Sequence, residues 1–273
     1  MMEISFIKLS PTQNMTVLIL SDVADQRRAE VAARLLAYDS VFAEQAGYVL
    51  QPSKAGANAA LQMMGGEFCG NATMSLAAYL AEQERLVKGE TREYQLQVSG
   101  TDELVPCRIK RLEDGYEGTV KMPLPLGTRK ITLATDCGVV QAKLISFSGI
   151  AHIVLPISLG VSSEEAERRL PQWNEEIGAD ALGALIVNES TLEVHPVVYV
   201  PAIQTVTHER GCGSGAAAIA CDQLYSTGGT HTRVEVRQPG GVICAEVFAE
   251  GGTIRDLTIQ AKVCIVARGI AYI

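Results

Sequence analysis

Two distant segments of this chain have nearly the same local sequence, and each is built around a cysteine. The first segment occupies residues 65–80 and the second occupies residues 208–220. At Cys69 and at Cys212 the order is Cys-Gly-polar-small, followed by small and apolar residues that favour a helix. The pattern predicts a thiol at the N-terminus of each helix, where free N–H groups and the helix dipole favour the thiolate.

The cysteine segments belong to a longer internal repeat. The two cysteines are 143 positions apart. A strand–turn–strand pattern at residues 6–19 recurs at 144–155 with an offset of 137, and a hairpin pattern at 94–109 recurs at 234–247 with an offset of 140. A near-constant spacing indicates two copies of one unit, although glycine-rich turns can coincide by chance. Two copies predict two similar domains with a cleft between them.

Length and charge are compatible with two domains in an ordinary globular enzyme. The chain has 273 residues, beyond the size at which one hydrophobic core usually stops growing. Its net charge of −8 argues against nucleic acid and anionic membranes as partners. The sequence shows no run of 18 apolar residues and no export signal, and its seven cysteines are an odd number. We therefore expect a cytoplasmic protein that is not a membrane protein.

Two further helices are predicted besides the two that follow the cysteines. One spans residues 24–38, with Asp22 as its N-cap. The other spans residues 162–177 and begins with several glutamates, with Ser162 or Ser163 as its N-cap.

The repeat also predicts where the domains divide. A strand at residues 117–122 is expected to open the second unit, and a last strand at 262–273 is expected to return to the first. The N-terminal domain is therefore predicted to comprise residues 1–117 with 264–273, and the C-terminal domain to comprise residues 118–263.

No cofactor motif accompanies the cysteines. The chain has no Gly-x-Gly-x-x-Gly or Walker sequence, and none of its lysines has the phosphate-binding context of a pyridoxal phosphate enzyme. It also has no Cys-x-x-Cys pair, and its four histidines show no His-x₃-His spacing, which disfavours zinc. The sequence predicts neither a cofactor nor a metal.

Two such thiols suit the inversion of a carbon stereocentre. One cysteine, as the thiolate, removes a proton, and the other, as the thiol, delivers a proton to the opposite face. Without an electron sink the protein must itself stabilise the carbanion, by excluding water and by directing helix N-termini at the substrate carboxylate. The predicted partner is a small-molecule amino acid.

The motifs resemble those of the diaminopimelate epimerase-like superfamily, which includes proline racemases and phenazine-pathway isomerases. The motifs are the Cys-Gly-Asn segment at Cys69, the Cys-Gly-Ser-Gly segment at Cys212 and the Gln-Pro-Gly-Gly turn at residues 238–241, and they are spread over essentially the whole chain. The resemblance implies an α/β (α+β) fold of two pseudo-symmetric domains. Each would be a mostly antiparallel sheet wrapped round a central helix.

The same resemblance implies how the site works. It implies catalysis by the cysteine pair without pyridoxal phosphate or metal, in a protein that is a homodimer. It also implies that backbone N–H groups of Gly70 and Asn71, and of Gly213 and Ser214, bind the substrate carboxylate.

Within the superfamily the chain is most similar to the histidine racemases of staphylopine-type metallophore synthesis. The similarity lies in five short segments, at residues 14–16, 44–45, 66–75, 212–215 and 269–273. Diaminopimelate epimerases instead have Gly-Asn-Asp-Phe and Gly-Asn-Pro-His where this chain has Gln-Asn-Met-Thr and Gly-Ile-Ala-His. They also have Glu-Arg-Gly well upstream of the second cysteine, whereas here it adjoins that cysteine. These departures put diaminopimelate in doubt as the substrate.

Five further side chains are candidates for the substrate site. Asn14 and Asn71 are expected to contact substrate, the alternative being a role in turns. Glu44 and Glu209 would accept N–H bonds from an imidazole or from the substrate ammonium group, the alternatives being a solvated carboxylate and a helix-start charge. His152 would orient or shield the first cysteine, as its family counterpart does, or else be a core histidine.

Two classes of function follow. The first is a racemase that interconverts L-histidine and D-histidine for an opine-type metallophore, with a diaminopimelate epimerase or a racemase of another amino acid as the runner-up. The second is a non-catalytic amino-acid-binding or scaffold protein. Retention of both cysteines favours the enzyme.

Overall fold

The computed structural model describes residues 2–273, which form two compact units. Unit 1 comprises the chain up to Lys121 together with Gln260–Ile273, and unit 2 comprises Met122–Ile259. Each boundary lies four residues from the expected one. The strand predicted to open the second unit lies in unit 1, because it pairs with the preceding strand of that unit from Cys107↔Val120 to Arg111↔Tyr116.

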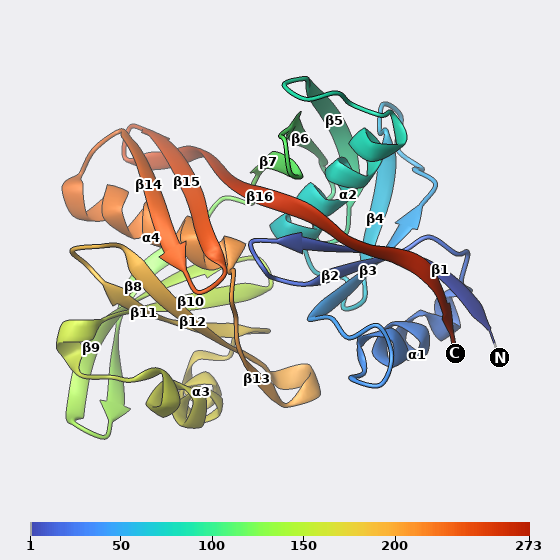
Figure 1. Cartoon of the computed structure of the whole chain (residues 1–273). Coiled ribbons are helices and arrows are strands. Elements are labelled where there is room, and N and C mark those ends of the chain that lie inside the picture. Colours follow the sequence, from blue (N-terminus) through green and yellow to red (C-terminus); the bar gives the residue numbers. More distant parts are fainter. Residues whose placement is uncertain (1) are drawn as a thin grey trace. The chain divides into compact units, whose positions relative to one another are not determined.

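Unit 1 is a sheet of eight strands around one helix (Figure 1). In spatial order the strands are β1 (Glu3–Pro11), β2 (Thr16–Ile19), β3 (Gln45–Leu50), β4 (Ala59–Met63), β5 (Thr91–Val98), β6 (Leu104–Arg111), β7 (Tyr116–Lys121) and β16 (Thr253–Tyr272). Strand β1 pairs with both β2 and β16, so the sheet closes on itself. Helix α2 (Gly70–Gln83) is mostly buried and packs against β1, β2, β3, β5, β6 and β7, while α1 (Asp25–Leu36) packs against β3.

Unit 2 repeats this plan. Its strands are β8 (Gly127–Thr135), β9 (Gly138–Phe147), β10 (Ile150–Pro156), β11 (Leu182–Asn188), β12 (Glu193–Val200), β14 (His231–Gln238), β15 (Gly241–Glu250) and the first part of β16, with β13 (Thr205–His208) paired to β12. The mostly buried central helix is α4 (Gly213–Thr227), and α3 (Ser163–Ile177) packs on β11, β12 and β13. Single 3₁₀ turns occur at Ile157–Leu159 and Pro201–Ile203.

The pairing pattern confirms the internal repeat. In unit 1 the parallel pairs are β2–β3 and β4–β5, which α1 and α2 connect. In unit 2 the parallel pairs are β10–β11 and β12–β14, and these enclose α3 and α4 in the chain. Each unit is therefore a mostly antiparallel sheet around a central helix, as the resemblance implies.

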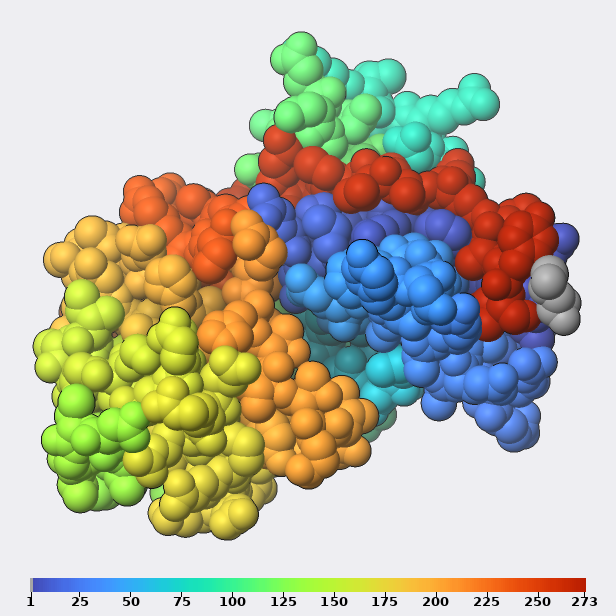
Figure 2. Space-filling model, turned by 60° about the horizontal axis from the view of Figure 1, so that its bottom comes forward, coloured from blue at the N-terminus to red at the C-terminus, as the bar shows by residue number. Residues whose placement is uncertain are grey.

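The N-caps predicted from the sequence can be compared one by one with the helix ends in the structure. The predicted Ser162 cap is confirmed, since its side chain accepts a hydrogen bond from the N–H of Glu165 at 3.2 Å. The predicted Asp22 cap is wrong, because α1 begins after Ala24 and has no side-chain cap. The predicted return of the last strand to the first unit is confirmed, and Figure 2 shows its C-terminal part lying at the surface.

Across residues 2–273, none of the helices combines the length and the apolar character that a membrane crossing requires.

Candidate functional site

Cys69 is the N-cap of α2, the central helix of unit 1. Its backbone is extended, and its sulfur accepts a hydrogen bond from the N–H of Ala72 at 3.4 Å. Its carbonyl accepts from both the N–H and the hydroxyl of Thr73, at 2.9 and 2.7 Å. A thiol takes the place of the usual Ser, Thr or Asp side chain at this cap, because Sγ can accept the same orphan N–H.

A chain of amide and carboxylate groups leads to the Cys69 sulfur. The thiol donates to Gln45 Oε1 at 3.1 Å, and Gln45 Nε2 donates to Asn14 Oδ1 and to Thr16 Oγ1 at 2.5 and 2.7 Å. Asn14 Nδ2 in turn donates to Glu44 Oε2 at 2.8 Å. We call Asn14, Glu44, Gln45 and Cys69 the Cys69 cluster. It unites three predicted site residues with Gln45, which the sequence prediction omitted.

The turn between β5 and β6 holds the chain just before Cys69. Ser99 Oγ donates to the carbonyl of Glu67 at 2.7 Å. Gly100 has φ +77°, and a Cβ atom there would lie 2.2 Å from the backbone nitrogen of Phe68. Only glycine lets the two backbones approach this closely.

Cys212 is the equivalent N-cap of α4 in unit 2. Its sulfur accepts from the N–H of Gly215 at 3.3 Å. The buried Gln238 side chain accepts from the Cys212 N–H at 2.6 Å and donates to the Cys212 carbonyl at 3.0 Å, so one amide fixes both backbone groups of this residue. Gln238 belongs to the turn motif noted in the sequence, but its amide was not predicted to contact the cysteine.

The side chains around the Cys212 sulfur differ from those around Cys69. Glu209 is only partly exposed, and burial raises the pKa of its carboxyl, while its hydrogen bond with the Cys212 thiol lowers it. Burial also raises the pKa of the Cys212 thiol well above its ordinary value, and the Glu209 charge and hydrogen bond add to this. Ser214 and the Gly215 N–H act in the opposite direction. The helix N-terminus therefore does favour the Cys212 thiolate, through the Gly215 N–H, but burial and Glu209 outweigh this effect.

His152 lies on β10 in unit 2 and is completely buried. Its Nε2 is 2.9 Å from Ser214 Oγ, which in turn is 3.6 Å from Cys212 Sγ. Burial lowers the pKa of His152 to about 3, so the imidazole is neutral. Gly183 on the neighbouring strand provides the space, since a Cβ there would lie 2.2 Å from His152 Nδ1. We call His152, Glu209, Cys212 and Ser214 the Cys212 cluster.

The structure thus distributes the predicted residues between the two central helices. Gly70 and Asn71 form the first turn of α2, and Gly213 and Ser214 form that of α4; Ser214 is partly exposed and the other three are buried. His152 contacts Ser214, and its predicted role toward Cys69 stays a prediction. Within the described part of the chain, no three His, Cys, Asp or Glu side chains are grouped to hold a metal ion.

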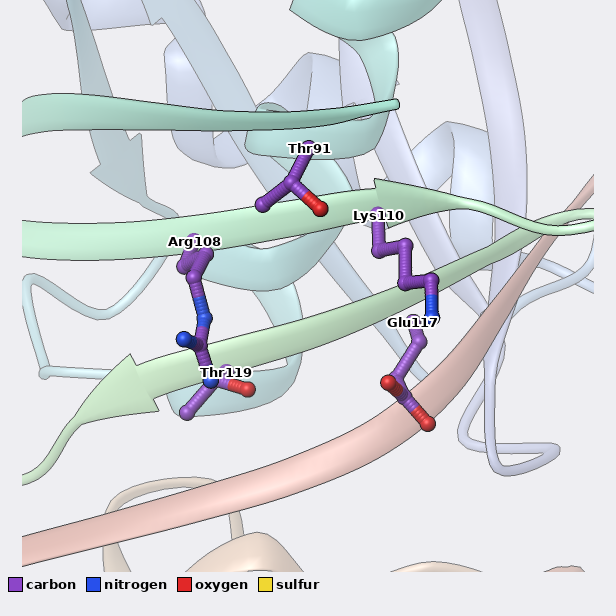
Figure 3. Close-up of a pocket in the computed structure, with 5 residues that line it drawn as sticks. All are labelled: Thr91, Arg108, Lys110, Glu117 and Thr119. Carbon is purple, nitrogen blue, oxygen red and sulfur yellow. The ribbon is translucent and has the colours of Figure 1, made fainter. Parts of the chain in front are cut away.

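Two cavities lie away from both clusters, and none of the predicted site residues lines either of them. One of about 240 Å³ lies on strands β5, β6 and β7, and Figure 3 shows its lining by Thr91, Arg108, Lys110, Glu117 and Thr119. A second of about 370 Å³ lies in unit 2, beside the β9–β10 turn and the end of α3. Neither cavity includes a thiol.

The fold is that of known racemases and epimerases. The structure is similar to a hydroxyproline epimerase from Agrobacterium vitis, with a TM-score of 0.74 and 13% identity over 98% of this chain and 92% of that one. It is also similar to a phenazine biosynthesis protein of the PhzF family from Enterococcus faecalis, with a TM-score of 0.61 and 14% identity over 100% of both chains. At these identities the likeness establishes the two-domain fold alone.

Sequence relatives are more specific. The family model of the histidine racemase CntK N-terminal domain matches residues 3–272. A histidine racemase of Staphylococcus aureus (strain Mu50) is 32% identical over 276 residues, which are 99% of this chain and 98% of the relative. One of Fusobacterium nucleatum is 28% identical, with 99% and 97% covered. The chain belongs to this histidine racemase family and is an isomerase.

Proposed function

We propose that this protein interconverts L-histidine and D-histidine, with Cys69 and Cys212 as its two acid–base groups. The observation that carries the proposal is that each thiol caps the central helix of its unit and accepts an N–H from the third residue along, at 3.4 and 3.3 Å. The repeat has therefore kept a thiol in the same backbone position twice. Membership of the histidine racemase family supports histidine as the substrate.

The chemistry needs one proton acceptor and one proton donor on opposite faces of the α-carbon. As a thiolate, one cysteine takes the α-proton, which leaves a carbanion whose charge spreads into the carboxylate. The other cysteine, as a thiol, gives its proton to the opposite face and becomes the thiolate. The roles of Cys69 and Cys212 exchange in the reverse direction, so the enzyme is restored after the two half-cycles.

The first helical turns supply the stabilising dipoles. Gly70 and Asn71, and Gly213 and Ser214, begin helices of 14 and 15 residues, and the N–H groups at a helix N-terminus favour negative charge. We propose that they bind the substrate carboxylate and hold it as its charge increases. Hydrogen bonds of this kind that strengthen in the transition state lower the barrier directly.

The Glu209 carboxylate gives Cys212 a route to the reactive form. Burial raises the pKa of the Glu209 carboxyl, which makes its carboxylate a better proton acceptor, while burial and the Glu209 charge also raise the pKa of the Cys212 thiol. Transfer of the thiol proton from Cys212 to Glu209 makes the thiolate without releasing a proton to solvent. Asn14, Glu44 and His152 complete the proposed site, with the two glutamates selecting a side chain that donates N–H bonds.

The remaining parts of the proposal concern the setting of the reaction. We propose that neither pyridoxal phosphate nor a metal takes part, that the protein is a cytoplasmic homodimer, and that its D-histidine supplies an opine-type metallophore. The runner-up substrates are diaminopimelate and other amino acids, and the alternative class is a non-catalytic amino-acid-binding protein.

The experiment is α-proton exchange in deuterated water, followed separately for L-histidine, D-histidine, diaminopimelate, proline and alanine. Deuterium incorporation into histidine, together with loss of optical rotation, is the expected result in protein prepared without added pyridoxal phosphate and treated with EDTA. Absence of exchange with every amino acid would favour the binding protein. Faster exchange of diaminopimelate would replace the substrate and leave the acid–base pair in place.

A further inference from the structure

The Gln45 amide faces the Cys69 thiol, and the proposed reaction gives this contact no role. Cys69 Sγ lies 3.1 Å from Gln45 Oε1, with the S–H as donor. An amide oxygen only accepts hydrogen bonds, so this contact exists for the thiol and not for the thiolate. A hydrogen bond made by the neutral form raises the pKa of the group that makes it. The contact therefore favours protonated Cys69.

Which atom of the Gln45 amide faces the sulfur is determined further along the Cys69 cluster. Glu44, as a carboxylate, only accepts, so the Asn14 amide must present Nδ2 to it and Oδ1 to the other side. Asn14 Oδ1 then accepts from Gln45 Nε2 at 2.5 Å. This places Gln45 Oε1 toward Cys69.

Thr16 fixes the same orientation a second time. Its hydroxyl donates to the carbonyl of Asn14 at 3.1 Å, so the oxygen is available to accept from Gln45 Nε2 at 2.7 Å. Thr16 is completely buried and Asn14 is 5% exposed. Reversing the Gln45 amide would set its carbonyl oxygen against Asn14 Oδ1 and leave both acceptors without their donor, which buried groups do not tolerate cheaply.

We propose that Gln45 is a positioning residue that holds Cys69 in the thiol form, and that Glu44, Asn14 and Thr16 act through it by fixing its orientation. The inference rests on the proposed function, in which Cys69 is one of the two acid–base groups. It assigns a starting role to each cysteine in the enzyme before substrate binds. Cys69 enters as the proton donor, whereas Cys212 can pass its proton to Glu209 and enter as the base.

The test is the pH dependence of alkylation of Cys69, which is partly exposed. Full-length protein is treated with iodoacetamide between about pH 6 and 10, and the Cys69 peptide is quantified by mass spectrometry, which separates it from the six other cysteines. Gln45→Ala removes the acceptor and admits water, which can donate to the thiolate. We expect the pH at which Cys69 alkylation reaches half of its maximum rate, the alkylation midpoint, to fall by about 0.5 to 1 pH unit. This shift corresponds to the free energy of one neutral hydrogen bond.

Two more variants make the sign of the shift decisive. Gln45→Glu sets a carboxylate beside the thiol and is expected to raise the midpoint. Thr16→Val removes one anchor of the amide without touching the sulfur, and is expected to lower the midpoint by less than Gln45→Ala does. The matched control is Gln97→Ala, since Gln97 is also in unit 1 and also has fixed partners, Ser53 and Lys54.

An unchanged midpoint in the two Gln45 variants overturns the proposal, as does a shift of equal size in the Gln97 control. If Gln45→Ala does not fold, Gln45→Glu and Thr16→Val decide by their opposite signs. The readout does not depend on turnover. Racemisation by Cys69→Ser would therefore remove the proposed function, while the alkylation midpoints would still test the contact between Gln45 and Cys69.

Discussion

The two cysteines have the same backbone setting and different chemical surroundings. Both cap a central helix, and both accept an N–H from the residue three positions on. Cys69 is partly exposed and donates to a neutral amide, whereas Cys212 is 4% exposed and contacts the Glu209 carboxylate and the Ser214 hydroxyl. The Glu209 carboxylate beside Cys212 is a group that can take the thiol proton.

This difference separates what the fold requires from what the chemistry requires. A helix N-cap needs one acceptor at a fixed place, and a thiol satisfies that need equally in both units. Protonation depends instead on the charges, burial and hydrogen bonds around each sulfur, and these differ between the two units. A racemase needs two opposite protonation states at once, so two identical surroundings would leave the starting states of the thiols undetermined.

The strongest test of the comparison replaces each thiol in turn. Cys69→Ser and Cys212→Ser are each expected to lower racemisation by about 10³-fold or more, because a hydroxyl is a far weaker acid than a thiol and cannot serve as the base. The measurement is the rate of loss of optical rotation starting from each enantiomer of histidine. Cys137→Ser is the matched control, since Cys137 is exposed and lies outside both clusters. Full activity in either variant would contradict the two-base mechanism.

The close backbone approach that holds the segment before Cys69 can be tested by adding a methyl group at Gly100. Gly100→Ala in unit 1 meets both a positive φ and the Phe68 backbone, and should destabilise the fold by about 3 kcal/mol. Gly89→Ala is the control, because Gly89 also has a positive φ, +88°, but nothing within 4 Å of the added carbon; it should cost about 1 kcal/mol. Urea unfolding of both variants measures the difference. Equal midpoints would mean that the close approach to Phe68 is unimportant.

How much of this was predictable depends on sequence separation. The two cysteine helices and the Ser162 cap were predicted because their signals lie within four residues along the chain. Gln45 contacts Cys69 from 24 positions away and Gln238 contacts Cys212 from 26, and a glutamine in a strand gives no local sign of its partner. The sequence motifs contained both glutamines without indicating what their amides do.

Charge shows the same limit. The sequence correctly places Cys212 at a helix N-terminus with Glu209 close by, but the direction of the thiol's pKa shift follows mainly from burial, which the folded structure reveals. Strands β8 and β13 were also missed. Most residues of β8 are exposed, as are three of the four residues of β13, so neither strand has the apolar run that marks a buried one.

Substrate choice tests whether the two glutamates serve a common purpose despite their different clusters. Glu44→Ala and Glu209→Ala are each expected to lower kcat/KM for histidine by about 10²-fold, because an imidazole or ammonium donor loses its charged acceptor. Glu103→Ala, an exposed glutamate of unit 1, is the control. The measurement is a panel of histidine, diaminopimelate, proline and alanine, in which wild type should prefer histidine. If both variants show the same kcat/KM values as the wild type for all four amino acids, the glutamates do not select the substrate.

The smallest expected effect concerns stability and the buried imidazole that only the Cys212 cluster contains. In the unfolded chain His152 binds a proton below about pH 6.5, but in the folded protein burial lowers its pKa to about 3. Between these values the unfolded state holds more protons, so stability falls as pH falls. From pH 7.5 to pH 5 the loss attributable to His152 should be about 2 kcal/mol.

Other groups titrate in the same range, so the effect must be isolated by difference. Urea unfolding of the wild type and of His152→Gln is compared at the two pH values, and the variant should lack this part of the loss because glutamine has no proton to gain. His195→Gln replaces an exposed histidine of unit 2 and should lose as much stability as the wild type. If His152→Gln follows the wild type instead, the imidazole must gain a proton without unfolding. Protonation of His152 would then reach Cys212 through Ser214, and the Cys212 cluster would respond to pH through His152 as well as through Glu209.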